Sequence, residues 1–261
     1  FSVLMRVGLA ALVFLPFLRT RGQSPRTIVL YMLVGAMQLG IMYLLAFRAY
    51  LYLTVSEFLL FTVFTPLYIT LIYDLLSGRK LRWGYLLSAA LAVLGAAIIR
   101  YDKVSDHFWT GLLLVQLSNL CFAIGMVGYK RLMEVRPMPQ HNAFAWFYVG
   151  AFIVAVAAWF MLGNAQKLPT TTLQWSVLVW LGVVASGLGY FMWNYGATQV
   201  DAGTLGIMNN VHVPAGLLVN LAIWQEQPHW PSFISGALVI LASLWVHRRW
   251  VAPHSGQTAD D

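Results

Sequence analysis

Polar side chains interrupt an apolar segment near the C-terminal end, where residues 209–214 read Asn-Asn-Val-His-Val-Pro. Carboxamides and a neutral imidazole offer both hydrogen-bond donors and acceptors, so they can hold a small molecule in a fixed orientation. If the segment is helical, one face spanning about 80° carries Asn209, His212, Gly216 and Asn220. Pro214 frees the carbonyl of Asn210, which lies beside this face. The run is therefore predicted to form one wall of a binding site.

Polar and aromatic side chains recur at helical spacing in other apolar segments. Gln116 and Asn119 share one face, and Tyr190, Trp193 and Asn194 cluster on another. The remaining members of the predicted site are Gln38, Arg48, Glu57, Phe61, Phe64 and Tyr68. Together they describe a cavity with amide donors and acceptors, aromatic walls and one or two charges. Such a cavity suits a small, partly apolar ligand with polar ends.

Each of these residues also has a structural alternative. Buried amides often link helices to one another, and aromatic faces often serve packing. Arg48 and Glu57 lie on adjoining segments and can pair with each other, and His212 can be a neutral hydrogen-bonded side chain rather than a proton carrier. We expect a structural role for Arg6. Recurrence of polar faces on segments from both halves favours a binding site, because links between helices need only pairs.

Composition predicts the elements that position these residues. Of the 261 residues, 60% are hydrophobic and 10% are charged, whereas globular domains carry about a quarter charged residues. The apolar residues form long blocks near the roughly 20 residues that a helix needs to cross a bilayer. The sequence therefore predicts an all-α polytopic membrane protein with helices at 1–18, 28–50, 56–76, 84–100, 109–129, 142–162, 174–198, 203–224 and 231–247.

Basic residues predict the orientation of these helices. The net charge of +7 comes largely from short loops on one side of the predicted membrane, including "RTRGQSPR", "GRKLR" and "KRLMEVR". Because such loops remain in the cytoplasm, we expect the C-terminus there, with a disordered tail over 248–261. Nine helices then place residue 1 outside, which fits a further helix before it and a total of ten.

An internal repeat predicts the same total. Residues 70–95 align with 217–242 without a gap, and one further residue of offset places Pro66 on Pro214 and Ala49 on Ala197. The predicted first repeat is 1–100, lacking its first helix, and the second is 109–247. Repeats of five helices insert in opposite orientations, and transporters built in this way bind substrate between the repeats.

Three stretches carry a resemblance to a known family: "LMRVGLAALVFLP", "LAFRAYLYLTVSEFLLFTVFTPLY" and "GYFMWNYGATQVDAGTLGIMNNVHVPAGLLVNLAIWQEQ". The chain, apart from its tail, resembles the drug/metabolite transporter superfamily, specifically its EamA-type branch of ten helices. It departs from the branch at Arg79, where an acid is usual after the fourth helix, whereas the second half keeps Glu226. We interpret that acid as a helix-end feature.

The resemblance implies a function as well as a fold. "AIGMVGYKRLMEVRPMPQHNAFAWFY" and "IMNNVHVPAGLLVN" resemble members that take up biotin across the bacterial inner membrane. Uptake of biotin by alternating access is therefore implied, with amides around the ureido ring, aromatic residues around the apolar part and Arg48 at the carboxylate. The alternative is an exporter of amino acids, metabolites or drugs on the same fold.

Other functional classes find no support in the sequence. There is no phosphate-binding loop of the G-x-x-x-x-G-K-[ST] type and no catalytic constellation, so we expect neither an enzyme nor a cofactor. Cys121 has no partner at metal-ligand spacing. The expected partners are a small substrate and membrane lipid, without nucleic acid. Proton symport and facilitated uptake both remain open.

Overall fold

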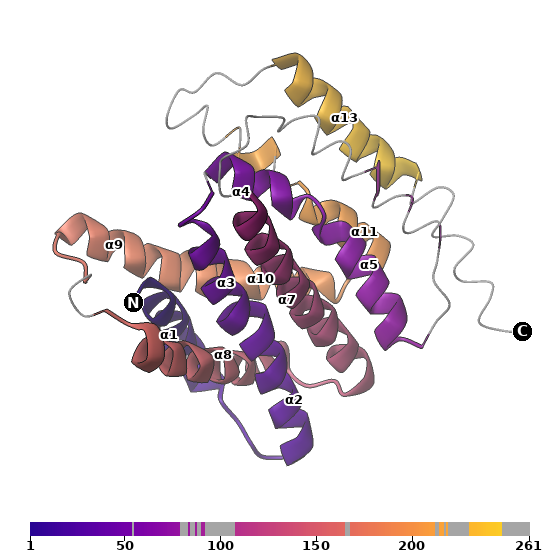
Figure 1. Cartoon of the computed structure of the whole chain (residues 1–261). Coiled ribbons are helices and arrows are strands. Elements are labelled where there is room, and N and C mark those ends of the chain that lie inside the picture. Colours follow the sequence, from indigo (N-terminus) through magenta and orange to yellow (C-terminus); the bar gives the residue numbers. More distant parts are fainter. Residues whose placement is uncertain are drawn as a thin grey trace, which may run out of the picture. The chain divides into compact units, whose positions relative to one another are not determined.

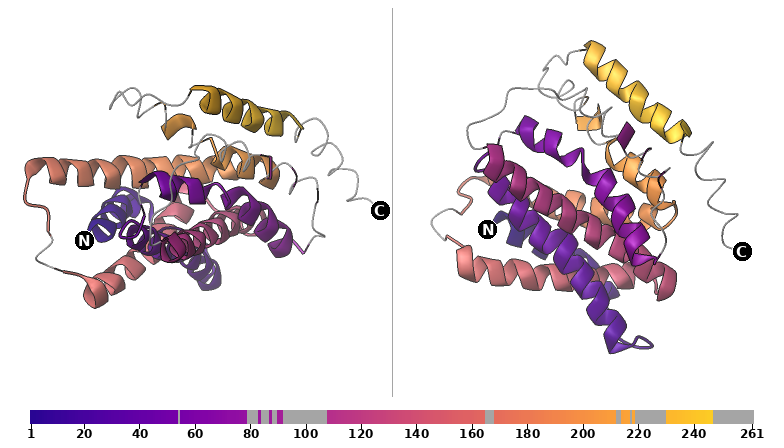
Figure 2. Two further views of the ribbon diagram at one scale, coloured as in Figure 1. Left: turned by 45° about the horizontal axis from the view of Figure 1, so that its top comes forward. Right: turned by 45° about the vertical axis from the view of Figure 1, so that its right-hand side comes forward.

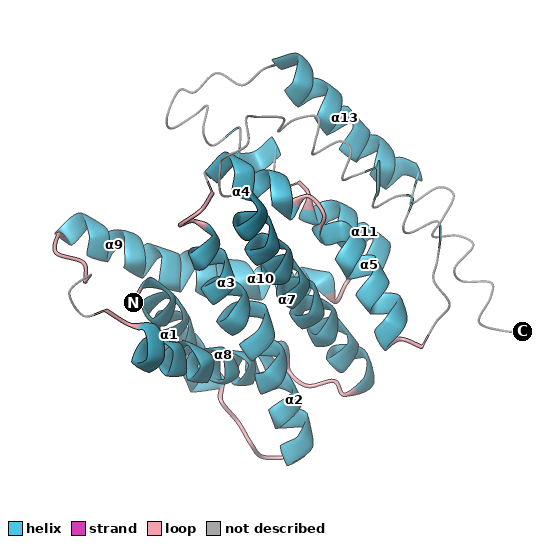
Figure 3. Ribbon diagram, viewed as in Figure 1, coloured by secondary structure: helices cyan, strands magenta, loops and turns pink. Residues whose placement is uncertain are grey.

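The computed structural model describes residues 1–53, 55–78, 83, 87, 90–91, 108–164, 168–211, 214–216, 218 and 230–246. Within this part every regular element is a helix (Figure 3), and the predicted all-α class is confirmed. His212, the side chain of Glu57, most of the predicted helix 84–100 and the tail 248–261 lie outside the described residues.

Fourteen elements follow one another in the described residues. Those before residue 80 are α1 (Ser2–Phe14), η1 (Leu15–Phe17), α2 (Pro25–Gly35), η2 (Ala36–Ile41), α3 (Met42–Ala49), α4 (Val55–Thr62) and α5 (Thr65–Leu76). The later ones are α7 (Phe108–Val135), α8 (Gln140–Leu162), α9 (Thr172–Trp180), η4 (Leu181–Gly189), α10 (Tyr190–Ala197), α11 (Ala202–Asn209) and α13 (Trp230–Val246).

Four continuous helical spans in the described part are long and apolar enough to cross a bilayer. They are Pro25–Ala49, Trp109–Val135, Gln140–Leu162 and Thr172–Ala197. Each lies on one of the helices that the sequence predicts.

Two of these spans contain a π-helical segment. η2 lies within Pro25–Ala49, and η4 lies within Thr172–Ala197. A π segment is rare, and it often marks a functional position in a helix. The offset that places Ala49 on Ala197 also places Gln38 of η2 on Ser186 of η4. The two π segments therefore fall at equivalent positions under the predicted repeat.

Two helices predicted as continuous, over 56–76 and 203–224, are interrupted. Residues 63–64 separate α4 from α5, and residues 210–211 form a turn after α11. Each interruption lies just before a proline, Pro66 or Pro214. A proline has no N–H to donate, and its ring clashes with the preceding helical turn. The prediction of uninterrupted helices was wrong at these points, because both prolines end a helix rather than bend it.

The chain divides into two compact units that differ from the predicted repeats. One comprises Phe1–Phe47 and Cys121–Gln199, and the other comprises Arg48–Leu120 and Val200–Asp261. The first unit takes α1, α2 and most of α3 from the first predicted repeat and α8–α10 from the second. The second unit takes α4 and α5 from the first repeat and α11 and α13 from the second.

The first unit is built around α8, which packs against α1, α2 and η2 (Figure 1). Its contact with α2 is backbone against backbone. A Cβ atom added to Gly35 would overlap the carbonyl of Phe147, and one added to Gly150 would overlap the carbonyl of Met32. Small residues allow membrane helices to approach this closely.

The second unit brings the two interrupted helices together. α11 packs against α5 and α13, and the neighbouring positions of α5 and α11 can be followed in Figure 2. A Cβ atom on Gly206 would lie 3.3 Å from the carbonyl oxygen of Pro66. Ala49, Leu53, Phe61 and Val115 form a small buried core in this unit.

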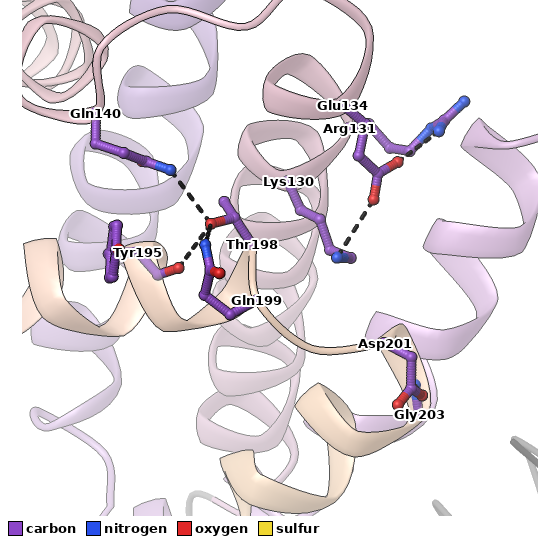
Figure 4. A network of polar contacts seen from close by, with 9 residues as sticks. All are labelled: Lys130, Arg131, Glu134, Gln140, Tyr195, Thr198, Gln199, Asp201 and Gly203. Atoms are coloured by element: carbon purple, nitrogen blue, oxygen red, sulfur yellow. Dashed lines mark hydrogen bonds and ion pairs between the residues drawn. The ribbon is translucent and has the colours of Figure 1, made fainter.

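Capping side chains and ion pairs hold several helix ends. Ser24 caps α2, and Thr171 forms a capping box with Gln174 on α9. Asp201 caps α11 by accepting hydrogen bonds from the backbone N–H groups of Gly203 and Thr204 (Figure 4). In the last turns of α7, Glu134 pairs with Lys130 at 3.3 Å and with Arg131 at 2.5 Å.

The close approach of α2 and α8 gives a test of the fold. We expect Gly35→Ala and Gly150→Ala each to lower the free energy of unfolding by about 1–3 kcal/mol, because the added methyl group meets backbone that cannot rotate away. Gly196→Ala is the matched control, since a Cβ atom there has no neighbour within 4 Å. Thermal unfolding of the purified full-length protein in detergent measures the difference. Equal melting temperatures for the three variants would contradict the packing.

Candidate functional site

In the second unit, two of the predicted site amides bind the end of α4. Gln116 Nε2 donates to the carbonyl of Phe61 at 3.0 Å, and Asn119 Nδ2 donates to the same oxygen at 2.9 Å. The last carbonyls of a helix have no donor within that helix, and in lipid no water replaces it. The amides of α7 therefore stabilise the interruption between α4 and α5.

A third predicted amide connects the two interruptions. Asn210 Nδ2 donates to the carbonyl of Val63 at 3.1 Å, and the Asn210 side chain is fully buried. We refer to residues 61–65 and 209–211 as the paired breaks. Interrupted helices in corresponding positions of two halves are the best pointer to a transporter's binding site, because unwound backbone there can meet a substrate. Asn209, also buried, ends α11 at this point.

The aromatic side chains of the predicted site differ from one another in burial and in hydrogen bonding. The Tyr68 hydroxyl donates to Gln116 Oε1 at 2.9 Å, which adds Tyr68 to the amide network. The Phe61 ring belongs to the buried core of the unit, whereas Phe64 is 42% exposed. Arg48 is exposed near the end of α3. The paired breaks therefore gather Asn209, Asn210, Gln116, Asn119, Phe61, Phe64 and Tyr68 within one unit.

In the first unit, the predicted site residues contact the middle of α7. Gln38 packs against Gly125, and the Trp193 indole N–H donates to Met126 Sδ at 3.0 Å. The ring of Tyr190 lies 6.4 Å from that of Phe122. This half of α7 therefore touches both η2 and α10.

Among the described residues of this unit, two buried side chains have polar atoms without a protein partner. Both side-chain polar atoms of Gln38 are buried and lack a hydrogen bond, and so does the Oδ1 atom of Asn194. The Asn194 Nδ2 group donates to the carbonyl of Tyr190 at 3.1 Å. A buried polar group without a partner costs about 1–3 kcal/mol, so such groups in a native protein need an explanation. A bound molecule with donors and acceptors would satisfy them.

A cluster of hydroxyl groups in the first unit was not predicted from the sequence. The Tyr43 and Ser186 hydroxyls lie 3.1 Å apart, and the Tyr148 hydroxyl donates to the carbonyl of Ser186. Arg6 donates one hydrogen bond to the Ser186 hydroxyl and another to the Tyr43 hydroxyl. Tyrosines on apolar helices read as packing residues, which is why this cluster was missed. Ser186 shares a helix face with Tyr190 and Asn194 in the sequence, and that spacing was the signal that pointed to part of the cluster.

The two units offer different chemistry. The side-chain amide N–H groups at the paired breaks donate hydrogen bonds to backbone carbonyls, so they stabilise the interrupted backbone. Gln38 and Asn194 keep buried polar atoms that have no hydrogen-bond partner in the protein. In the part of the chain that the structure describes, no group of three or more His, Cys, Asp or Glu side chains is placed to hold a metal ion.

The shared carbonyl of Phe61 gives a test by double substitution. Asn119→Ala or Gln116→Ala alone leaves one amide donor on that oxygen, whereas the double variant leaves none. We expect the double variant to lose about 1–3 kcal/mol of stability beyond the sum of the single losses, which is the cost of an unsatisfied buried carbonyl. Unfolding of the purified full-length protein in detergent measures all three variants. Strict additivity would show that the two amides act independently.

Comparisons with known proteins agree with this fold. A model of the EamA-like transporter family matches residues 109–248. The chain is 83% identical to the biotin transporter of Escherichia coli (strain K12) over 261 residues, which cover 100% of this chain and 87% of that protein. It is 53% identical to a probable biotin transporter of Pseudomonas aeruginosa over 250 residues, covering 95% of this chain and 87% of that protein.

A solved crystal structure shows the same fold at low sequence identity. It superposes with a TM-score of 0.77 at 16% identity and covers 97% of this chain and 88% of that one. The family model covers more than half of the residues, and the Escherichia coli relative matches along the whole length of this chain. The chain therefore belongs to the EamA-like transporter family.

Proposed function

We propose that this protein takes up biotin across the bacterial inner membrane. The observation that carries the proposal is the 83% identity, over the whole chain, to a protein named as a biotin transporter. At that identity the side chains around a substrate change little, whereas a different substrate needs different contacts. The cytoplasmic location of the C-terminus, supported by the basic loops, belongs to the same proposal.

The unpartnered amides of the first unit suit the polar ring of biotin. A ureido group has two N–H donors and one carbonyl acceptor, and a carboxamide such as Gln38 complements it with an acceptor and a donor. The Oδ1 atom of Asn194 is a second acceptor for an N–H group. Tyr190 and Trp193 offer aromatic surface for the thiophane ring and the alkyl chain.

The paired breaks serve the transport cycle in this proposal. Alternating access requires helices to change direction around a substrate held between the two repeats. A helix that is already interrupted can bend there without losing backbone hydrogen bonds, because side-chain amides satisfy the carbonyls of Phe61 and Val63. In this proposal Asn209 and Asn210 lie where the backbone bends, and they contact the substrate as the protein changes conformation.

Uptake of radiolabelled biotin tests the function directly. Cells that lack both biotin uptake and biotin synthesis would express the full-length protein. We expect saturable uptake at nanomolar concentration. No uptake by well-expressed protein would contradict the proposal, and efflux from loaded membrane vesicles would then test an exporter.

The same uptake assay tests the site. Gln38→Ala removes the donor and the acceptor assigned to the ureido ring, so we expect the apparent affinity to fall about tenfold or more. Asn142→Ala is the matched control, because Asn142 is also a buried amide but accepts a hydrogen bond from the backbone of Arg19. Membrane expression of both variants must equal that of the wild type. Unchanged uptake by Gln38→Ala would remove Gln38 from the site.

A further inference from the structure

The π segment η4 lies directly before the predicted site residues of α10. It spans Leu181–Gly189, and the helix continues through Tyr190, Trp193 and Asn194. A π segment holds one residue more than the α-helix that would cover the same turns. If η4 became α-helical, each later residue would advance by one position, which is about 100° around the axis and about 1.5 Å along it. The form of η4 therefore decides which face of α10 Asn194 occupies.

Glycines suit the π form of η4. A Cβ atom added to Gly187 would lie 3.2 Å from the carbonyl oxygen of Gly182, and one added to Gly189 would lie 3.3 Å from that of Val184. Both distances are tighter than usual for a Cβ atom. The members of each pair are five residues apart, which is the spacing of hydrogen bonds in a π-helix. A larger residue at either position would crowd a carbonyl group of the π turn.

Tyr148 on α8 supplies a hydrogen-bond donor to the end of η4. Its hydroxyl group donates to the carbonyl of Ser186 and, at 3.3 Å, to the carbonyl of Gly187. Where a helix changes from π to α, the hydrogen-bond pattern shifts by one residue, and in lipid no water can satisfy a carbonyl left without its N–H. The Tyr148 hydroxyl therefore stabilises the π form at the junction with α10.

Packing fixes the position of that hydroxyl group. Tyr148 is fully buried, its ring stacks on that of Phe14 with centroids 5.4 Å apart, and it meets Phe144 edge to face. The side chain of Ser186 is held as well, because its hydroxyl lies 3.1 Å from the hydroxyl of Tyr43 on α3. The end of η4 is therefore held through its backbone from α8 and through a side chain from α3.

We propose that Tyr148 is a positioning residue for the substrate. Its hydroxyl group keeps η4 in the π form, and the π form places Tyr190 and Asn194 on the face of α10 that binds. Without the hydroxyl, η4 becomes α-helical and Trp193 takes the place of Asn194. The effect on biotin rests on the proposed function, whereas the effect on α10 rests on contacts within the first unit.

The orientation of α10 can be measured without transport. Spin labels on Met192→Cys of α10 and Leu33→Cys of α2, both exposed positions, report a distance in purified full-length protein, with Cys121→Ser removing the single native cysteine. A second pair replaces Leu33 with Val135→Cys of α7. A rotation of about 100° moves a side chain on a helix about 10–12 Å wide by about 8 Å. We therefore expect Tyr148→Phe to shift the distance by several ångströms in at least one pair, as read by pulsed electron paramagnetic resonance.

Deletion of one residue separates positioning from packing. Removing Val184 shortens η4 by one residue, which returns the later residues to their places when the segment is α-helical. We expect the labels in Tyr148→Phe with this deletion to regain their wild-type distances, whereas a packing role predicts a further disturbance. Gly187→Ala disfavours the π form without changing Tyr148, so it should move the labels as Tyr148→Phe does. It also carries the test if Tyr148→Phe does not fold.

Uptake kinetics show the consequence for the substrate. Tyr148→Phe should raise the KM for biotin about tenfold or more, because a displaced Asn194 loses its hydrogen bond to the ligand, and deletion of Val184 should restore most of the affinity. Tyr31→Phe is the matched control. Tyr31 is also fully buried and donates to a backbone carbonyl, that of Arg136, but it does not contact η4 through this bond. Its removal should change neither KM nor the label distances.

The outcomes separate this proposal from the proposed function. The proposal is overturned if the labels stay in place in both Tyr148→Phe and Gly187→Ala, or if the deletion does not return them. It is also overturned if the labels move while KM for biotin is unchanged. If the labels respond as expected but the wild type takes up no biotin, Tyr148 positions α10 and biotin is not the substrate.

Discussion

Unsatisfied backbone carbonyls are the constraint on which this structure depends. Within lipid a helix must satisfy its own hydrogen bonds, and a helix that stops exposes carbonyls to a medium without donors. Here the chain stops two helices before Pro66 and Pro214 and supplies the donors from side chains: Gln116 and Asn119 on one oxygen, and Asn210 on another. These hydrogen bonds join α7 to the end of α4, and they join the end of α11 to the break before α5.

The sequence predicted the class of fold well, because long apolar blocks have few other solutions. It also singled out the buried amides, since polar residues in such blocks stand out. Three of them, Gln116, Asn119 and Asn210, donate to backbone carbonyls in the structure, and their contact with a ligand stays a prediction. Spacing cannot show whether an amide faces a substrate or a neighbouring helix end, and the interruption at residues 210–211 ended the continuous face on which Asn209 and Gly216 had been placed.

The hydroxyl cluster escaped prediction for a different reason. Composition alone suggests that Tyr43 and Tyr148 are aromatic packing residues. Their hydrogen bonds are seen only in the fold, where η4 brings Ser186 to Tyr43 and Tyr148. A π segment shifts every later side chain around its helix, so spacing along the sequence gives the wrong face after it. Both η2 and η4 lie in helices that carry predicted site residues.

The paired breaks also govern how this sequence can drift over evolutionary time. Along an intact membrane helix the backbone bonds itself, so any apolar side chain serves at a lipid-facing position such as Met161 or Met192, both largely exposed. At the breaks the same bonds depend on particular side chains, and Gln116, Asn119 and Asn210 have few chemical substitutes. Tolerance to mutation should therefore be concentrated outside a small set of amides, which makes neutral variation in relatives a map of where the helices stop.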